Sequence, residues 1–327
     1  MLAYIVRRAL YMLLMLIMGS VVSFMVITLP PGDYMTSYIQ QLKAQGSDVS
    51  IDQEVALRRQ YGLDYPLPVQ YFKWITQLLQ GNMGRSFQWG KQVNDVLKDR
   101  IMPTILISLA TLVVTYAIAI PIGIYSAVRQ YSILDYLFTV IGFAGVSVPE
   151  FLLALVLMFY AYRNFGITIG GLFSNEFVDA PWSVAKLADM ARHLPVPLLV
   201  ISLSGTAYLI RVMRAMLLDE LPKPYVQTAR AKGLKESRLL IKYPIRVALN
   251  PIASTIGWAL PALFSGQVIV SVVLNLPTIG PVLFQSLMTE DMFLASSAVL
   301  ISTALTLVGT LLSDILLAWL DPRILLV

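Results

Sequence analysis

Six apolar stretches of this chain are each long enough to cross a lipid bilayer as a helix. A bilayer core needs about 20 consecutive apolar residues in helical form. The only charges inside the stretches are Glu150, Asp314 and, near the end of the fourth, Arg211 and Arg214. The stretches are Ala9–Leu29, Ile101–Val128, Tyr136–Tyr162, Leu194 to about Leu218, Val247–Asn275 and Met292–Leu320. The sequence therefore predicts an all-α membrane protein with six transmembrane helices.

The composition supports a membrane protein and narrows its chemistry. Of 327 residues, 57% are hydrophobic and 13% are charged, whereas soluble domains carry about 25% charged residues. The formal net charge of +5 comes from basic residues beside the apolar stretches, so we interpret it as a topology signal and expect no nucleic-acid partner. There is no cysteine, and His193 is the only histidine. We expect no metal site and no disulfide.

The basic residues of the short loops predict the orientation, because such residues concentrate on the cytoplasmic side. With a cytoplasmic N-terminus, the outer short loops hold few basic residues, among them Lys186 and Arg192. The first stretch is expected to stay as a helix, since it is longer than the apolar region of a typical cleavable signal. Both chain ends are then expected in the cytoplasm. The inner segments hold Arg7, Arg8, Arg129, Arg214, Lys223, Arg230, Lys232, Lys235, Arg238, Lys242, Arg246 and Arg323.

This topology divides the chain into three parts. Residues 1–29 form the N-terminal tail and first helix, residues 30–100 an extracytoplasmic insertion, and residues 101–327 the core, with a cytoplasmic loop at 219–246. The insertion contains an amphipathic helical pattern that Pro66 and Pro68 introduce and Gly81 ends. Tyr71 and Trp74 within it are residue types suited to the water–lipid boundary.

The cytoplasmic loop contains a basic segment, Tyr225–Arg246, with signals for two short helices. Pro224 can begin the first helix without losing a needed donor, and Gly233 can end it in a left-handed turn. A second helix is expected from about Glu236 to Tyr243, where Pro244 should kink or end it. By composition alone, this segment is an ordinary basic loop.

The order of residues in the loop indicates more. Gln227-Thr-Ala-Arg-Ala-Lys-Gly233 resembles the EAA loop of bacterial ABC importer permeases, and the string from Tyr225 to Leu234 resembles the oligopeptide/dipeptide permease family. In that family this loop carries the coupling helix that sits in a cleft of the ATPase. The resemblance implies that the ATPase-coupling residues are Tyr225, Gln227, Thr228, Ala229, Arg230, Ala231, Lys232, Gly233 and Leu234.

Further strings extend the resemblance over nearly the whole chain. Residues 57–74 and 81–87 are similar to the family's segment between its first two helices, with Asn82 where aspartate is common. Ser147-Val-Pro-Glu-Phe151 resembles the family's Ser-Ile-Pro-x-Phe. The resemblance implies the type I importer permease fold with an insertion between helices 1 and 2. The other matching positions are Arg211, Arg214, Asn250, Pro251, Gly266, Asp314, Asp321, Pro322 and Arg323.

Two departures concern the segment after the fifth stretch. Ser271 stands where the family usually has a glutamate, and Thr278 replaces the first glycine of its Pro-Gly-x-Gly turn. The missing carboxylate puts in doubt any substrate contact that the glutamate makes in relatives.

Four polar residues in the apolar stretches are candidates for the translocation pathway. A carboxylate near the middle of a span, as expected for Glu150, is costly unless neutral, paired or hydrated. Glu150 either lines the pathway, bonds to backbone groups freed by Pro149, or faces a partner subunit. Gln267 and Ser271, spaced i and i+4, either line a channel or support helix packing. Ser147 is the fourth candidate.

Charges near the inner boundary are expected to be structural. Asp314 is predicted to pair with Arg323 or with an arginine of the fourth helix. The structural set is Arg211, Arg214, Asp314, Asp321 and Arg323.

The family resemblance implies a permease subunit of an ATP-driven importer in the cytoplasmic membrane of a bacterium or archaeon. The sequence has no Gly-x-x-x-x-Gly-Lys-Ser/Thr phosphate loop, so we expect no enzyme activity and no bound cofactor, with ATP and Mg used by partner ATPases. The expected partners are a second homologous, non-identical permease, with a homodimer as the alternative, two ATPase subunits and an extracytoplasmic substrate-binding protein.

Short peptides are the expected cargo, with oligosaccharides or nickel as alternatives. An ion-coupled secondary transporter is a further alternative, although the chain lacks the repeated halves that such proteins usually show. An intramembrane enzyme is disfavoured, because the sequence lacks a cysteine, a His-Glu-x-x-His motif and a Gly-x-Ser-x-Gly motif.

Overall fold

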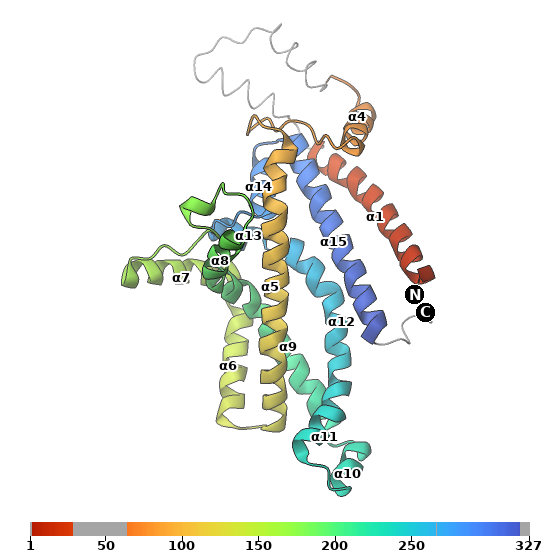
Figure 1. The fold of residues 1–327 in the computed structure, drawn as a ribbon, viewed down its shortest axis with the longest axis vertical. Helices are drawn as coiled ribbons and strands as arrows, with labels where there is room; N and C mark the ends of the chain where they lie inside the picture. Colours follow the sequence, from red (N-terminus) through yellow and green to blue (C-terminus); the bar gives the residue numbers. More distant parts are fainter. Residues whose placement is uncertain (1, 29–63, 266, 321–327) are drawn as a thin grey trace. The chain divides into compact units, whose positions relative to one another are not determined.

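The computed structural model describes residues 2–28, 64–265 and 267–320. Within these ranges the chain is helical, and its only β feature is an isolated antiparallel bridge between Arg85 and Gln92. The chain divides into two compact units. Of the described residues, unit 1 comprises those within Ile105–Leu276 and 309–320, and unit 2 comprises those within Leu2–Thr104 and Pro277–Val308. Figure 1 shows the helices of both units.

Unit 2 is built around the first turns of α5. Val93, Val96 and Leu97 pack against Ile279 and Leu294 in a buried cluster, which removes apolar surface from water. The amide of Ile279 donates to the Thr104 hydroxyl at 3.0 Å. The helices that contribute are α1 (Leu2–Thr28), α4 (Leu67–Leu79), the start of α5 (Val93–Val128), α14 (Ile279–Met288) and the start of α15 (Met292–Leu320).

Helix α4 confirms the amphipathic helix expected in the insertion, and its aromatic residues contact α1. Trp74 is only 2% exposed and stacks on Phe24 of α1, with ring centroids 5.9 Å apart. Tyr71 shares a hydrogen bond with Ser20 of α1 at 2.8 Å. The indole of Trp74 therefore packs against α1, and its position at the water–lipid boundary stays a prediction.

Helix α9 (Pro195–Glu220) is the central element of unit 1. It packs against α6 (Ile133–Ser147), α7 (Glu150–Phe165), α8 (Val184–His193) and α12 (Pro244–Ser265). Met213 and Leu217 of α9 are fully buried in one cluster with Ala119 of α5 and Ile252 of α12. A side chain at Gly123 of α5 would come within 2.6 Å of Met213, so α5 and α9 pack closely at that point.

The third apolar stretch is not one straight helix. Helix α6 ends at Ser147, α7 begins at Glu150, and the two helices are bent by 103°. Proline supplies no amide hydrogen and disfavours helical geometry in the residue before it, and Val148 accordingly has φ −92° and ψ 123°. The prediction that Glu150 lies mid-helix is therefore wrong, since it occupies the first turn of α7.

The fifth stretch is also interrupted. Helix α12 ends at Ser265, and the short helix α13 (Val268–Val273) follows it. In the described residues, four helices are long and apolar enough to cross a membrane, or five if the bent α6–α7 pair is one span. The count of six transmembrane helices therefore stays a prediction. The four single helices are Val6–Met25, Val93–Val128, Pro195–Glu220 and Met292–Ile315.

Candidate functional sites: a basic helical hairpin and a polar cavity

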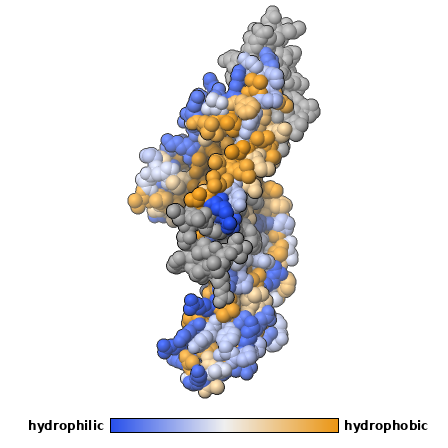
Figure 2. Space-filling view, turned by 90° about the vertical axis from the view of Figure 1, so that its right-hand side faces the viewer, coloured by the Kyte–Doolittle hydropathy of each residue, from blue (hydrophilic) through white to orange (hydrophobic). Residues whose placement is uncertain are grey.

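Two short helices after α9 form a hairpin that we call the hook, residues Pro224–Lys242. Its helices are α10 (Pro224–Ala231) and α11 (Glu236–Lys242). Gly233 has φ +75°, in the left-handed region that favours glycine, and its amide donates to the Arg230 carbonyl at 3.0 Å. The predicted helix start at Pro224 and the glycine stop are confirmed. Hydrophilic side chains gather over this end of unit 1 (Figure 2).

The hook has its own small apolar interior. Val226, Ala229 and Leu239 are buried, and Leu234 packs against them. Of the residues implied in ATPase coupling, Ala229 is therefore internal and Leu234 half-buried. The others form the outer face of α10 and its turn: Tyr225, Gln227, Thr228, Arg230, Ala231, Lys232 and Gly233 are exposed.

An ion pair closes the hook from outside. Arg230 donates to both oxygens of Glu236, from Nε at 3.1 Å and from Nη2 at 2.5 Å. The pair raises the pKa of Arg230 and lowers that of Glu236. Because both side chains are about half exposed, the stability gain is small. The pair fixes how α10 lies against α11.

A buried carboxylate joins the hook to α9. Glu220, the last residue of α9, is 8% exposed and accepts hydrogen bonds from the Lys223 ammonium and the Tyr225 hydroxyl. Burial, together with Glu220, raises the pKa of Tyr225 to about 12. Sequence reasoning missed Glu220. The available signal was an acid three residues before the first lysine of a basic segment.

The two arginines of α9 have different surroundings. Arg214 pairs with Asp135 of α6, whereas the Arg211 guanidinium lies 5.5 Å from the Phe143 ring centre. Asp135 was not predicted as a partner of Arg214, and the pairing predicted for Asp314 stays a prediction. Asp321 and Arg323 lie outside the described residues.

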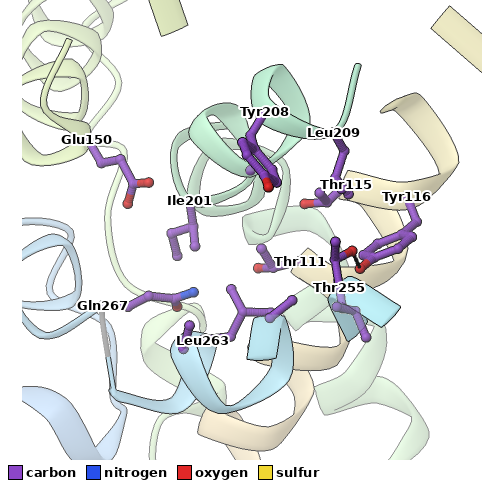
Figure 3. Close-up of a pocket in the computed structure, with 14 residues that line it drawn as sticks. Thr111, Thr115, Tyr116, Glu150, Ile201, Tyr208, Leu209, Thr255, Leu263 and Gln267 are labelled. Atoms are coloured by element: carbon purple, nitrogen blue, oxygen red, sulfur yellow. Dashed lines mark hydrogen bonds between the residues drawn. The ribbon is translucent and has the colours of Figure 1, made fainter. Parts of the chain in front are cut away.

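A cavity of about 270 Å³ lies inside unit 1. Helices α5, α7, α9 and α12 contribute to its wall (Figure 3). The Tyr116 hydroxyl of α5 and the Thr255 hydroxyl of α12 share a hydrogen bond of 2.6 Å at one side. The lining residues are Thr111, Leu112, Thr115, Tyr116, Glu150, Ile201, Gly205, Tyr208, Leu209, Thr255, Ala259, Ala262, Leu263 and Gln267.

The cavity brings together two of the four predicted pathway residues. Glu150 and Gln267 both line it, and their side chains point toward its interior (Figure 3). Ser147 is exposed, and its hydroxyl donates to the Phe143 carbonyl at 2.8 Å. Ser271 is 3% exposed within α13 and is not part of the wall. Gln267 and Ser271 are one helical turn apart, as their spacing predicted, since the Ser271 amide donates to the Gln267 carbonyl at 2.9 Å, but only Gln267 lines the cavity.

Several polar groups of the wall have no protein partner. The Gln267 amide nitrogen and the Thr111 hydroxyl are buried without a hydrogen bond, which costs free energy unless a ligand or water completes them. The Glu150 carboxylate hydrogen-bonds with Ser204 of α9. The described residues contain no cluster of three or more potential metal ligands. His193 lies at the end of α8, with Nδ1 2.9 Å from the Asp189 carbonyl oxygen.

Two family descriptions match the chain. Residues 119–326 match the binding-protein-dependent transport system inner membrane component, and residues 1–110 match the N-terminal part of membrane components of such systems. A Brucella suis protein that carries the provisional name of peptide permease is 36% identical over 326 residues, covering 99% of each chain. The Bacillus subtilis oligopeptide transport system permease protein AppB is 34% identical, covering 98% of this chain and 99% of AppB. A nickel import system permease of Staphylococcus aureus is 29% identical, covering 98% and 90%.

Proposed function

Because the chain belongs to the family of inner-membrane components of binding-protein-dependent transport systems, we propose that it is a permease subunit of an ATP-driven importer of short peptides. The supporting observation is the hook. Its exposed outer face carries the residues that resemble the ATPase-coupling loop, and Gly233 ends α10 where that resemblance requires a stop.

The proposed assembly contains a second homologous permease, two ATPase subunits and a substrate-binding protein. The sequence has no phosphate loop of its own, so ATP and Mg are used by the ATPases. The proposed topology has six spans with both chain ends and the hook in the cytoplasm and residues 30–100 outside. The bias of basic residues supports this orientation.

The structure suggests how movement of the hook would reach the pathway. When ATP closes the ATPase dimer, its groove displaces α10. Glu220 transmits this displacement to α9, because its carboxylate bonds to Lys223 and Tyr225. Helix α9 in turn supplies Ile201 and Tyr208 to the cavity wall. A force on the hook therefore acts on a helix that forms part of the proposed pathway.

The cavity favours peptides over nickel as the cargo. A relative is named as a nickel permease, but the wall contains no histidine, cysteine or methionine among the described residues, and nickel suits imidazole ligands. The wall instead offers a carboxylate, an amide and hydroxyls, which suit the polar groups of a peptide. No observation favours oligosaccharides.

Two measurements test the proposed function. A tagged chain purified from its native membrane is expected to carry an ATPase and a second permease with it, and reconstituted vesicles are expected to take up a labelled tripeptide only with ATP and the binding protein. Recovery of neither partner would contradict the proposal. Uptake that persists without ATP but stops when the ion gradient collapses would identify an ion-coupled secondary transporter instead.

A further inference from the structure

The cavity in unit 1 has one charged group. Among the described residues of its wall, Glu150 alone is ionisable near neutral pH, and it forms no ion pair with them. Its hydrogen-bond partner Ser204 is a hydroxyl and carries no charge. A charge removed from water is costly unless a counter-charge or strong hydrogen bonds replace the lost solvation. A positively charged ligand group would supply that counter-charge.

Two donors of the same wall also have no acceptor among the described residues. The Gln267 amide nitrogen and the Thr111 hydroxyl are buried and unpaired. In Figure 3, Glu150 and Gln267 enter from the same side of the cavity, and Thr111 lies across from them. A ligand that completes the wall therefore needs a cationic donor for Glu150 and, close to it, an acceptor for Gln267 or Thr111.

The amino terminus of a peptide has this combination of groups. Its α-ammonium is a cation with three donor hydrogens. The carbonyl oxygen of the same residue is an acceptor, and it is separated from the nitrogen only by the α-carbon and the carbonyl carbon. A cavity of about 270 Å³ has room for the end of a peptide.

We propose that this cavity binds the amino terminus of the transported peptide, with Glu150 as counter-ion of the α-ammonium and Gln267 as donor to the first carbonyl. This assignment rests on the proposed function for the identity of the cargo. It makes Glu150 a specificity-determining residue: substrates with a free amino terminus are preferred to those in which that charge is blocked.

The preference for a cation can be measured without transport. Since the natural chain has no cysteine, Ala262→Cys introduces a single thiol in the exposed part of the cavity wall. In the assembled transporter, modification of this chain by a cationic methanethiosulfonate is compared with modification by an anionic one. The control is Ser254→Cys, which is exposed on the same helix and absent from the wall.

The expected ratio of cationic to anionic modification rates is roughly tenfold higher at position 262 than at position 254, because a nearby carboxylate attracts one reagent and repels the other. Glu150→Gln should bring the two ratios together. Equal ratios in the chain that retains Glu150 would overturn the assignment. If Glu150→Gln fails to accumulate, the assignment is tested by protection of the thiol at position 262 from modification. A tripeptide with a free amino terminus should slow the modification, and its N-acetylated form should not. Equal protection would also overturn the assignment.

Uptake tests the peptide itself. With the same binding protein throughout, the ratio of uptake rates for free and N-acetylated tripeptide reports differences at the permease. Glu150→Gln is expected to reduce this ratio roughly tenfold to hundredfold, the range of a lost charged hydrogen bond. An unchanged ratio in a variant that still transports would overturn the role of Glu150. By contrast, a transporter with cation-selective labelling that takes up no peptide would refute the peptide importer and leave a cation-binding cavity.

Discussion

The guanidinium of Arg214 donates to both carboxylate oxygens of Asp135, from Nε to Oδ1 at 2.9 Å and from Nη2 to Oδ2 at 3.0 Å. The Asp135 side chain is 3% exposed. The same carboxylate accepts from the Tyr131 amide at 3.0 Å, and its own backbone amide donates to the Ser132 cap. One carboxylate thus holds the turn between α5 and α6 and fixes it to α9.

Removing that carboxylate should destabilise the protein strongly. Asp135→Ala leaves the Arg214 charge without its partner, and breaking a buried ion pair from one side costs roughly 3 kcal/mol or more. We expect a clearly lower midpoint in thermal unfolding of the purified transporter. The control is Arg211→Gln on the same helix, where an exposed cation is lost and no buried charge is left behind. A similar midpoint for both variants would show that the pair does not hold α6 to α9.

Alanine at Gly233 tests the shape of the hook. An added Cβ would meet no atom within 4 Å, so the whole penalty is the left-handed backbone, about 1–2 kcal/mol. We expect uptake per ATP hydrolysed to fall several-fold while the amount of chain in the membrane stays constant. Gly90→Ala imposes a comparable strain, at φ +61° and with no atom within 4 Å, outside the hook. Normal uptake in the Gly233 variant, or an equal loss in both, would argue against a coupling role.

The link from α9 to the hook gives a separate prediction. Glu220→Gln keeps the shape of the side chain but weakens its hydrogen bonds to Lys223 and Tyr225. Movement of the ATPase should still displace α10, but less of that displacement should reach α9. We expect ATP hydrolysis to continue and uptake to decline. Glu236→Gln is the matched control, since it removes a carboxylate that is about half exposed, and such pairs contribute little. If the two variants behave alike, Glu220 does not transmit force.

Asp291 in unit 2 predicts a dependence of stability on pH. It precedes α15, is fully buried and accepts from the Ser86 hydroxyl and the amides of Gln88 and Leu294. Burial raises its pKa above the ordinary 3.8. The folded protein therefore holds a proton there that the unfolded chain releases. The resulting stability is fully present below the ordinary pKa and declines as pH rises through the raised value.

Asp291→Asn should remove this decline. Unfolding midpoints of the natural chain and the variant, measured from pH 4 to pH 8, are expected to converge at the acidic end and to separate as pH rises, with the variant more stable. Parallel curves would show that another group titrates. Asp291→Ala should lower stability throughout, because it leaves the Gln88 and Leu294 amides without an acceptor.

Local sequence signals predicted the hook well. Contacts between residues far apart in the sequence could not be predicted in the same way. Pro224 and Gly233 act on their own backbone, so the bounds of α10 could be read from single residues. Asp135 and Arg214 are 79 positions apart, and no helical period relates them. Trp74 was assigned to the membrane boundary from its residue type, whereas its contact with Phe24 depends on how α1 and α4 pack.

The candidate site shows the same division. Glu150 was recognised as a charge in an apolar stretch, and Pro149 was recognised as a break. Hydropathy nevertheless treated Tyr136–Tyr162 as one span, because it averages over residues and does not register a change of direction. Gln267 and Ser271 were expected to share one face because they are four residues apart. The structure keeps them one turn apart at the start of α13, but only Gln267 lines the cavity, and Ser271 is buried.

The right-angled corner at Val148–Pro149 has a consequence for the depth at which polar atoms lie. Helix α6 has 15 residues, so it is about 22 Å long at 1.5 Å per residue, less than the roughly 30 Å of hydrocarbon in a bilayer. If the chain enters the bilayer from one surface along α6, it therefore turns before it reaches the opposite surface. The uncapped amides at the start of α7 then lie within the hydrocarbon core of the bilayer, where only protein groups or bound water can accept their hydrogen bonds.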